Sequence, residues 1–168
     1  RDFTGVTNRE AFDTQVPVYL EQILDQVLAT AQTTVEMKNI VFHKTYAGHT
    51  PVLVFPDQLR QALVNLVTNA AQAMKGTGTL TLTTAVSDHT ATATIADSGP
   101  GISKQHLSKV FDPFFTTKPV GAGSGMGLAL AYGIVKAHQG RIEASSALGK
   151  GTCMRVYLPI SGARPRSV

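Results

Sequence analysis

The sequence is short of cysteine and of long apolar runs, and both shortages limit what the chain can be. Its single cysteine, Cys153, excludes an internal disulfide and a zinc site built from cysteines. No apolar run is long enough to cross a membrane as a helix, and the first residues lack the charged-then-apolar order of a signal peptide. We therefore expect a cytoplasmic domain. Because the sequence starts with Arg1, we expect it to be a piece of a longer protein, and membrane anchoring of that protein stays open.

Motifs for metal binding by histidine and for nucleophilic catalysis are also missing. The five histidines show no spacing typical of metal ligands, and no Ser/His/Asp arrangement is visible. The segment Gly149–Thr152 resembles part of a phosphate-binding P-loop but lacks its spacing, so we expect a hairpin turn there. The net charge is +4, but the basic residues are scattered. This pattern indicates attraction for an anionic ligand, and we expect no nucleic-acid partner.

The remaining sequence predicts one compact domain of helices and β-rich runs. Its 168 residues are 43% hydrophobic, which is enough to build a sizeable core. Helical patterns occupy 20–31, 57–74 with Asp57 as the N-cap, 103–110 with a serine cap, and 128–138. The β-rich runs are 40–46, 52–55, 79–86, 90–96, 141–146 and 152–158.

A phenylalanine-rich and glycine-rich stretch, 111–140, precedes and includes the last expected helix. Three phenylalanines fall within residues 111–115, and glycines stand at 121, 123, 125 and 127. Alternate glycines let a backbone approach a ligand closely, and the N-terminus of a helix favours phosphate. The stretch is either an ordinary glycine linker or a flap that closes over an anion. Lys118 is likewise either a solvated loop charge or a phosphate contact.

Three amides share one face of the helix expected over 57–74. Asn65, Asn69 and Gln72 lie four and three residues apart, so they stack one turn after another. They are either amides that hydrogen-bond to nearby backbone or a source of one oxygen ligand for Mg²⁺.

Asp97 ends a β-rich run and is followed by Gly99, Gly101 and Ile102. It is either an ordinary turn residue or an acceptor for the exocyclic amine of adenine, since an ionised carboxylate accepts hydrogen bonds and cannot donate them. In the second case the glycines admit the base and Ile102 covers one of its faces.

Four motifs now stand in order: NLVTNAAQAM at 65–74, DSGPGI at 97–102, FDPFFTTKP at 111–119 and GSGMGLALAYGIVKAHQG at 123–140. Together they resemble the N box, first glycine box, F box and second glycine box of the histidine-kinase ATP-binding domain, within the gyrase/chaperone/histidine-kinase/mismatch-repair ATPase superfamily. The residues within these motifs are similar to those of nitrogen-regulatory and hybrid sensor kinases. The resemblance covers about 16–159. It implies an α/β two-layer sandwich, with a mixed sheet of about five strands covered on one face by about three helices.

The resemblance also implies roles for individual residues. Asn69 matches the Mg²⁺ ligand, Asp97 the adenine-binding aspartate, and Thr152 the threonine often placed behind the adenine. Met126 stands where leucine is usual, and Gln139 where glycine is usual. The full expected ATP site comprises Asn69, Gln72, Asp97, Gly99, Gly101, Ile102, Phe114, Phe115, Gly123, Gly125, Met126, Gly127, Leu128 and Thr152, with Asn65 and Lys118 as the catalytic pair.

The reaction implied is transfer of the ATP γ-phosphate to a histidine. In gyrase-like and chaperone-like relatives a glutamate activates water where this chain has Asn65, which cannot act as a base. No histidine here is followed by Glu or Asp, so the acceptor is expected outside this sequence. The implied partners are the protein's own dimerisation domain and a response-regulator receiver domain, with a homodimeric full-length protein and a monomeric fragment. The alternatives are a stand-alone ATPase or Ser kinase, and a non-catalytic nucleotide-sensing module.

We expect three regions: a remnant of the dimerisation hairpin and linker over 1–15, the catalytic domain over 16–160 and a polar tail over 161–168. Within the catalytic domain, the segment 116–125 is expected to act as a lid over the phosphates.

Overall fold

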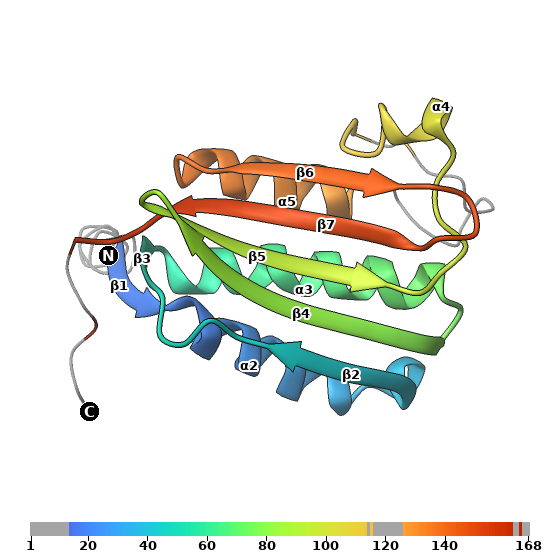
Figure 1. The fold of residues 1–168 in the computed structure, drawn as a ribbon, viewed down its shortest axis with the longest axis horizontal. Helices are drawn as coiled ribbons and strands as arrows, with labels where there is room; N and C mark the ends of the chain where they lie inside the picture. The colour runs from blue at the N-terminus through green and yellow to red at the C-terminus, as the bar shows by residue number, and fades with distance from the viewer. Residues whose placement is uncertain (1–13, 114, 116–125, 163–164, 166–168) are drawn as a thin grey trace, which may run out of the picture.

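The computed structural model describes residues 14–113, 115, 126–162 and 165, with Val35 described by its backbone alone. These residues form two layers, a sheet and a layer of helices, so the expected fold class is confirmed (Figure 1). The main sheet has five strands in the order β2-β4-β5-β7-β6. Their bounds are β2 Asn39–Thr45, β4 Thr77–Ser87, β5 Thr90–Asp97, β6 Arg141–Ser146 and β7 Thr152–Pro159.

The sheet is mixed, as expected. Strand β2 runs parallel to β4, and the other three pairings are antiparallel. The β4–β5 hairpin turns through Asp88 and His89, which have φ values of 49° and 67°. Two consecutive residues with positive φ match the right-handed twist of paired strands, and this turn fixes the register at Ser87 opposite Thr90.

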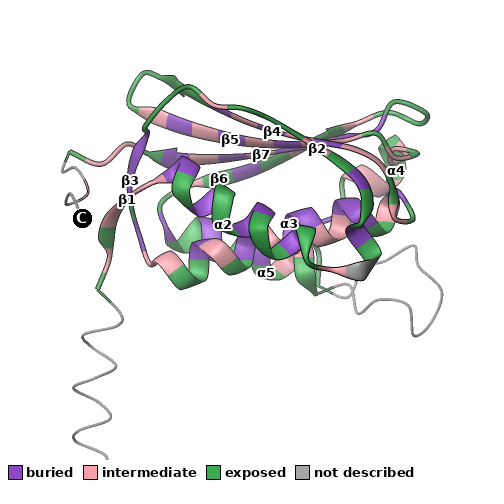
Figure 2. Ribbon diagram, turned by 90° about the horizontal axis from the view of Figure 1, so that it is seen from below, coloured by how far each residue is buried: buried purple, intermediate pink, exposed green. Residues whose placement is uncertain are grey.

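Three helices cover one face of the sheet: α2 Leu20–Gln32, α3 Pro56–Ala73 and α5 Gly127–Ala137 (Figure 2). Their apolar stripes face the sheet, and Leu59 and Leu63 of α3 are completely buried. Burying a leucine side chain contributes roughly 2 kcal/mol, so these stripes hold the two layers together. The helical positions expected for α2 are all buried: Leu20, Ile23, Leu24, Val27, Leu28 and Ala31.

One strand is absent from the β-rich runs expected from the sequence. The segment Val16–Tyr19 is a strand, β1, which pairs antiparallel with β3 Pro51–Val54 in a separate two-stranded sheet. Its partner lies more than thirty residues away, so local pattern did not reveal it.

The N-cap of α3 is Phe55 rather than Asp57. Pro56 takes the first helical position, where a missing N–H costs nothing, and this moves the helix start ahead of Asp57. The Asp57 carboxylate instead accepts a hydrogen bond from Arg60 Nη1 at 2.6 Å. The expected serine cap at the short helix α4 Lys104–Leu107 is confirmed, because Ser103 Oγ accepts from the His106 N–H at 3.3 Å.

Candidate functional site

Three neighbouring strands bring Asp97, Thr152 and Ser146 into one row at one end of the sheet, where β5 and β6 end and β7 begins (Figure 1). Asp97 of β5 is the register partner of Thr152 of β7, and Thr152 is in turn the partner of Ser146 of β6. Side chains alternate between the faces of a strand, and the buried residues of β7 have even numbers from Thr152 to Leu158. The row therefore lies on the face that the helices cover.

The Asp97 carboxylate is held in place by two backbone groups. Its Oδ1 accepts hydrogen bonds from the N–H of Gly99 at 2.8 Å and from the N–H of Thr152 at 3.3 Å. Burial raises the pKa of this carboxyl above its usual range, and the two N–H groups act in the opposite direction without cancelling the effect. Oδ2 makes no hydrogen bond within the described part of the chain. A fixed carboxylate with one open oxygen is suited to accepting a hydrogen bond from a ligand.

Gly101 is required by close packing, and Gly99 stands in a tightly packed position. A Cβ at Gly99 would stand 3.0 Å from Asp97 Oδ1, and Gly99 also faces the end of α3 at Ala73. Gly101 has φ +81°, and a Cβ there would collide with the carbonyl oxygen of Ala147. The loop 97–102 is thus pressed against both α3 and the β6–β7 connection, which places Ile102 next to the row of strand ends.

Ser146 is a central residue of this site that sequence reasoning missed. Its Oγ accepts a hydrogen bond from the Ile102 N–H at 2.7 Å, lies 2.7 Å from the carbonyl oxygen of Gly151 and lies 2.9 Å from Thr152 Oγ1. Thr152 itself is 7% exposed. A serine in a surface strand carries no local signal of function. Only its position opposite Thr152, across the expected hairpin, could have pointed to it.

The helix face with the three amides lies on α3, as expected. Asn65 and Asn69 are half-buried, whereas Gln72 is exposed. Asn65 Nδ2 donates a hydrogen bond to the carbonyl oxygen of Gly127 at 3.3 Å, which links α3 to the start of α5. The Asn69 side chain makes no hydrogen bond within the described residues. Its amide oxygen is therefore available, and an amide oxygen is a ligand that Mg²⁺ accepts.

Helix α5 begins beside Asn65 with an uncapped N-terminus. Its N-cap is Met126, with no side-chain hydrogen bond to the first turn, and the first helical hydrogen bond runs from the Leu130 N–H to the Met126 carbonyl oxygen. The N–H groups of the preceding turn, at Gly127 and Leu128, therefore have no carbonyl partner inside the helix. Such groups, together with the helix dipole, favour an anion.

The aromatic stretch before α5 is described only in part. Phe111 is half-buried, and its ring centroid lies 5.3 Å from that of Tyr132 in α5. Phe115 is also half-buried, and its ring centroid lies 5.6 Å from that of His106. Four expected site residues fall outside the described residues: Phe114, Lys118, Gly123 and Gly125. The expected lid segment 116–125 also lies outside them.

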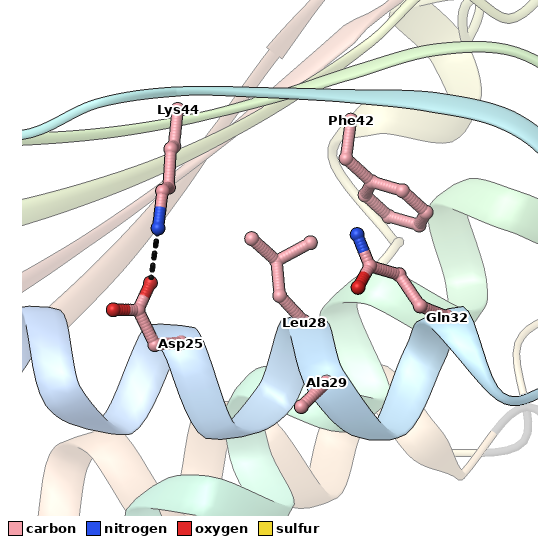
Figure 3. A pocket seen from close by; sticks show the side chains of 6 residues that line it. All are labelled: Asp25, Leu28, Ala29, Gln32, Phe42 and Lys44. Carbon is pink, nitrogen blue, oxygen red and sulfur yellow. Dashed lines mark hydrogen bonds and ion pairs between the residues drawn. The ribbon is translucent and has the colours of Figure 1, made fainter.

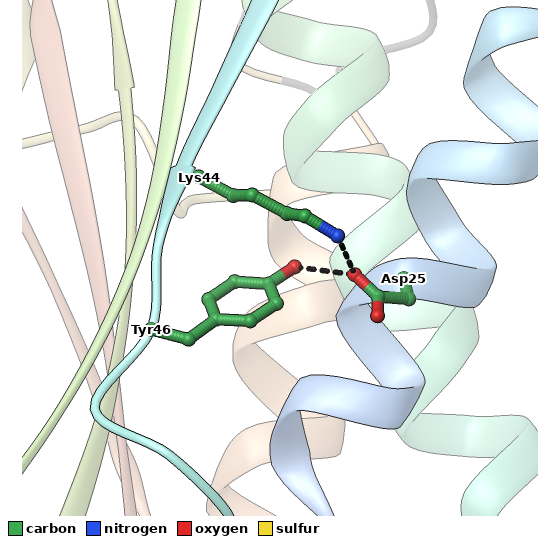
Figure 4. Close-up of polar contacts among 3 residues, drawn as sticks. All are labelled: Asp25, Lys44 and Tyr46. Carbon is green, nitrogen blue, oxygen red and sulfur yellow. Dashed lines mark hydrogen bonds and ion pairs between the residues drawn. The ribbon is translucent and has the colours of Figure 1, made fainter.

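A groove of about 230 Å³ lies at the opposite edge of the sheet, between α2 and β2 (Figure 3). Phe42, Leu28 and Ala29 supply its apolar lining. Beside it, Asp25 Oδ1 accepts hydrogen bonds from Lys44 Nζ at 3.0 Å and from Tyr46 Oη at 2.9 Å (Figure 4). Burial and the neighbouring Asp25 both raise the pKa of Tyr46. None of the expected nucleotide residues lines this groove.

Comparison with protein families assigns the chain to a family. Residues 55–162 match the family model described as histidine kinase-, DNA gyrase B-, and HSP90-like ATPase. The chain belongs to this family. The match includes every described residue of the expected ATP site, and it confirms the resemblance seen in the four sequence motifs.

Proteins named as kinases are among the relatives of this chain. The chain is 32% identical over 143 residues to sporulation kinase C of Bacillus subtilis, covering 84% of this chain and 33% of that kinase. The mycobacterial sensor histidine kinase MprB superposes with a TM-score of 0.77 at 29% identity, covering 90% of this chain and 99% of that one. Full-length ShkA in complex with AMPPNP superposes with a TM-score of 0.79 at 26% identity, covering 90% of this chain and 32% of that one. The chain thus spans about a third of the length of sporulation kinase C.

Two features are absent from the described residues. No group of three or more His, Cys, Asp or Glu side chains is placed to hold a metal. No described helix is long and apolar enough to cross a membrane.

Proposed function

We propose that this ATPase-family domain binds Mg–ATP and transfers the γ-phosphate to a histidine on a dimerisation domain outside this sequence. The observation that carries the proposal is the Asp97 carboxylate, which is held by two N–H groups and has no hydrogen bond at Oδ2 within the described residues. The loop after Asp97 packs against the C-terminal end of α3, the helix that carries Asn69. Sporulation kinase C and the sensor histidine kinase MprB are similar to this chain, and this similarity to kinases supports phosphoryl transfer as the reaction. The structure of ShkA supports ATP as the nucleotide in this proposal, since it was solved with the ATP analogue AMPPNP.

On the base side, Asp97 Oδ2 accepts a hydrogen bond from the exocyclic amine of adenine and repels the carbonyl oxygen of guanine. Gly99 and Gly101 allow the base to approach the backbone, and Ile102 covers one of its faces. Thr152 lies behind the base, next to Asp97. A charge-assisted hydrogen bond of this kind contributes roughly 1.5–3 kcal/mol, which corresponds to about tenfold to hundredfold selectivity for adenine.

On the phosphate side, the Asn69 amide oxygen would hold Mg²⁺, and Gln72 lies one turn further along α3. A bound Mg²⁺ would supply charge neutralisation at the phosphates. The open N–H groups at Gly127 and Leu128, preceded by Met126, face the phosphate chain. The proposal also assigns Lys118, Gly123, Gly125, Phe114 and Phe115 to the nucleotide site, on the basis of the sequence motifs alone.

The choice of phosphoryl transfer over ATP hydrolysis rests on Asn65, whose amide cannot act as a general base. An amide is not a base, so this domain does not activate water in the way that a glutamate at this position would. Its contribution to transfer is to position the phosphates and to stabilise their charge, and the acceptor histidine supplies the nucleophile. We further propose that a response-regulator receiver domain takes the phosphate next. We also propose that the domain lies in the cytoplasm and that the full-length protein is a homodimer. In this proposal 1–15 is a remnant of the dimerisation hairpin and linker, 16–160 is the catalytic domain and 161–168 is a polar tail.

The deciding experiment mixes this chain with the dimerisation domain of its own protein and γ-labelled ATP. We expect acid-labile, base-stable label on the dimerisation domain, because phosphohistidine has that stability. Release of inorganic phosphate without a labelled protein would favour the stand-alone ATPase. Nucleotide binding with neither product would favour a sensing module.

A further inference from the structure

We propose that Ser146 is a positioning residue for base recognition, which fixes the Thr152 hydroxyl so that its oxygen can only accept a hydrogen bond inside the base site. This inference rests on the proposed nucleotide function. It concerns a residue of the edge strand β6 that no sequence motif marks, and the hydrogen bonds around one oxygen atom carry it.

The direction of these hydrogen bonds follows from counting protons. Ser146 Oγ has one proton and three polar neighbours: the Ile102 N–H, the Gly151 carbonyl oxygen and Thr152 Oγ1. The Ile102 N–H can only donate and the Gly151 carbonyl oxygen can only accept. The Ser146 proton therefore points to Gly151, at 2.7 Å. Thr152 must then donate its own proton to Ser146 across the remaining 2.9 Å.

The environment keeps this arrangement in place. Thr152 is 7% exposed, so water does not readily compete for its hydroxyl proton. Its backbone N–H is held by Asp97 Oδ1 at 3.3 Å, and its register between Asp97 and Ser146 is set by two antiparallel ladders. Hydrogen bonds that are shielded from water and share one atom reinforce each other.

The consequence is a base site with two neighbouring acceptors. Asp97 offers Oδ2, and Thr152 offers the lone pairs of an oxygen whose proton is already used. Such a pair favours a ligand that presents an amine donor. It also favours a bridging water that donates one proton to Thr152 Oγ1 and the other to a ring nitrogen of the base. Without Ser146, the Thr152 hydroxyl could rotate and donate, and this selection would weaken.

Ser146 has a second effect that the test must separate from the first. Its hydrogen bond from Ile102 also holds the loop 97–102 against β6. A loss of affinity in Ser146→Ala could therefore come from the loop or from the Thr152 hydroxyl. Only the second route depends on the hydroxyl of residue 152.

The experiment is a double-mutant cycle on the 168-residue chain, with Mg²⁺-free ADP as the probe and calorimetry as the readout. Omitting Mg²⁺ limits the contribution of Asn69, so the base side dominates. The variants are Ser146→Ala, Ser146→Thr, Thr152→Val and the Ser146→Ala/Thr152→Val pair. Ser146→Thr keeps the hydroxyl, and Thr152→Val keeps the shape of residue 152 while removing its hydroxyl. Thermal unfolding of each variant checks that it is folded at the titration temperature.

We expect Ser146→Ala to weaken ADP binding about five- to tenfold, the usual effect of one hydrogen bond. Ser146→Thr should bind ADP with the affinity of the wild type. In the Thr152→Val background, Ser146→Ala should lower the ADP affinity by less than about a further twofold.

Unchanged ADP affinity in Ser146→Ala would overturn the inference and leave the proposed function intact. An equal loss in both backgrounds would also overturn it, because Ser146 would then act through the loop alone. If the wild type bound no ADP, the proposed function and the inference would fall together.

Discussion

The two halves of the candidate nucleotide site are built in different ways. On the base side, Asp97 Oδ1 and the Ser146 and Thr152 hydroxyls are engaged in hydrogen bonds of 2.7–3.3 Å with one another or with nearby backbone. On the described part of the phosphate side, the Asn69 side chain makes no hydrogen bond, and α5 begins without a side-chain cap. The base half is therefore organised by the protein itself. On the phosphate side, the Asn69 amide has no protein partner among the described residues, and the proposed function assigns it a ligand partner.

This difference has a structural cause. The base side stands on three adjacent strands, whose ladders fix each residue opposite its neighbour. The phosphate side stands on two helices, α3 and α5, linked near the site by the 3.3 Å hydrogen bond from Asn65 to Gly127. Pre-formed groups reduce the cost of ordering a ligand, so the base should dominate affinity, while the phosphate side should dominate the response to Mg²⁺.

The largest effect is expected from Asp97. Asp97→Ala removes the acceptor for the adenine amine and should weaken ATP binding about a hundredfold, close to the upper range for a charged hydrogen bond. Asp97→Asn is the sharper variant, because its Oδ1 can still accept from Gly99 and Thr152 while an NH₂ replaces Oδ2. We expect it to lose most of the ATP-over-GTP preference, as measured by competition calorimetry. Equal ATP affinity in Asp97→Ala and the wild type would place the base elsewhere.

A smaller effect is expected from Asn69. Asn69→Ala should weaken Mg–ATP binding about tenfold, since one oxygen ligand of the cation is lost and water replaces it in part. The affinity for Mg²⁺-free ADP should change by less than about twofold, because the base side does not depend on the metal. Titrations with and without Mg²⁺ measure both numbers. Equal losses under the two conditions would remove the distinction between the two halves.

The pH dependence of stability tests the burial of the Asp97 carboxyl. Burial raises its pKa in the folded state above its ordinary value, so the folded state binds more protons than the unfolded state in the pH range between the two pKa values. Stability should therefore fall as the pH rises through this window and stay level above it. Asp97→Asn, which does not titrate, serves as the reference. Urea unfolding of both proteins from about pH 3 to 7 should show the wild type losing stability relative to Asp97→Asn.

The smallest effect is expected at the opposite edge of the sheet. The Lys44–Asp25 ion pair is 52% and 50% exposed, and such pairs contribute about 1 kcal/mol or less. Asp25→Asn should lower the free energy of unfolding by no more than this and should leave ADP affinity unchanged. Urea unfolding and calorimetry on the same sample check both. A change in ADP affinity would mean that the α2–β2 edge is coupled to the nucleotide site.

Much of the fold was predictable because its signals are local. The apolar stripes of α2 and α3 follow helical spacing, and the β-rich run expected over 40–46 forms strand β2. Asp97, Gly99 and Gly101 lie within five residues, so their shared role was also visible in the sequence. The exceptions had competing causes. Pro56 displaced the expected cap at Asp57, and β1 was hidden because its partner is distant in sequence.

The sequence by itself determined the order of the helices and of the strands other than β1, the family and the residues that its four motifs contain, because each of these depends on neighbours along the chain. Tertiary structure alone decided that Ser146 stands beside Thr152 and Ile102, that the Asn69 amide has no protein partner among the described residues, and that Asn65 joins α3 to α5. The physical reason is that a hydrogen bond depends on distance and direction in space. Strand register and helix packing set both only when the whole domain has formed.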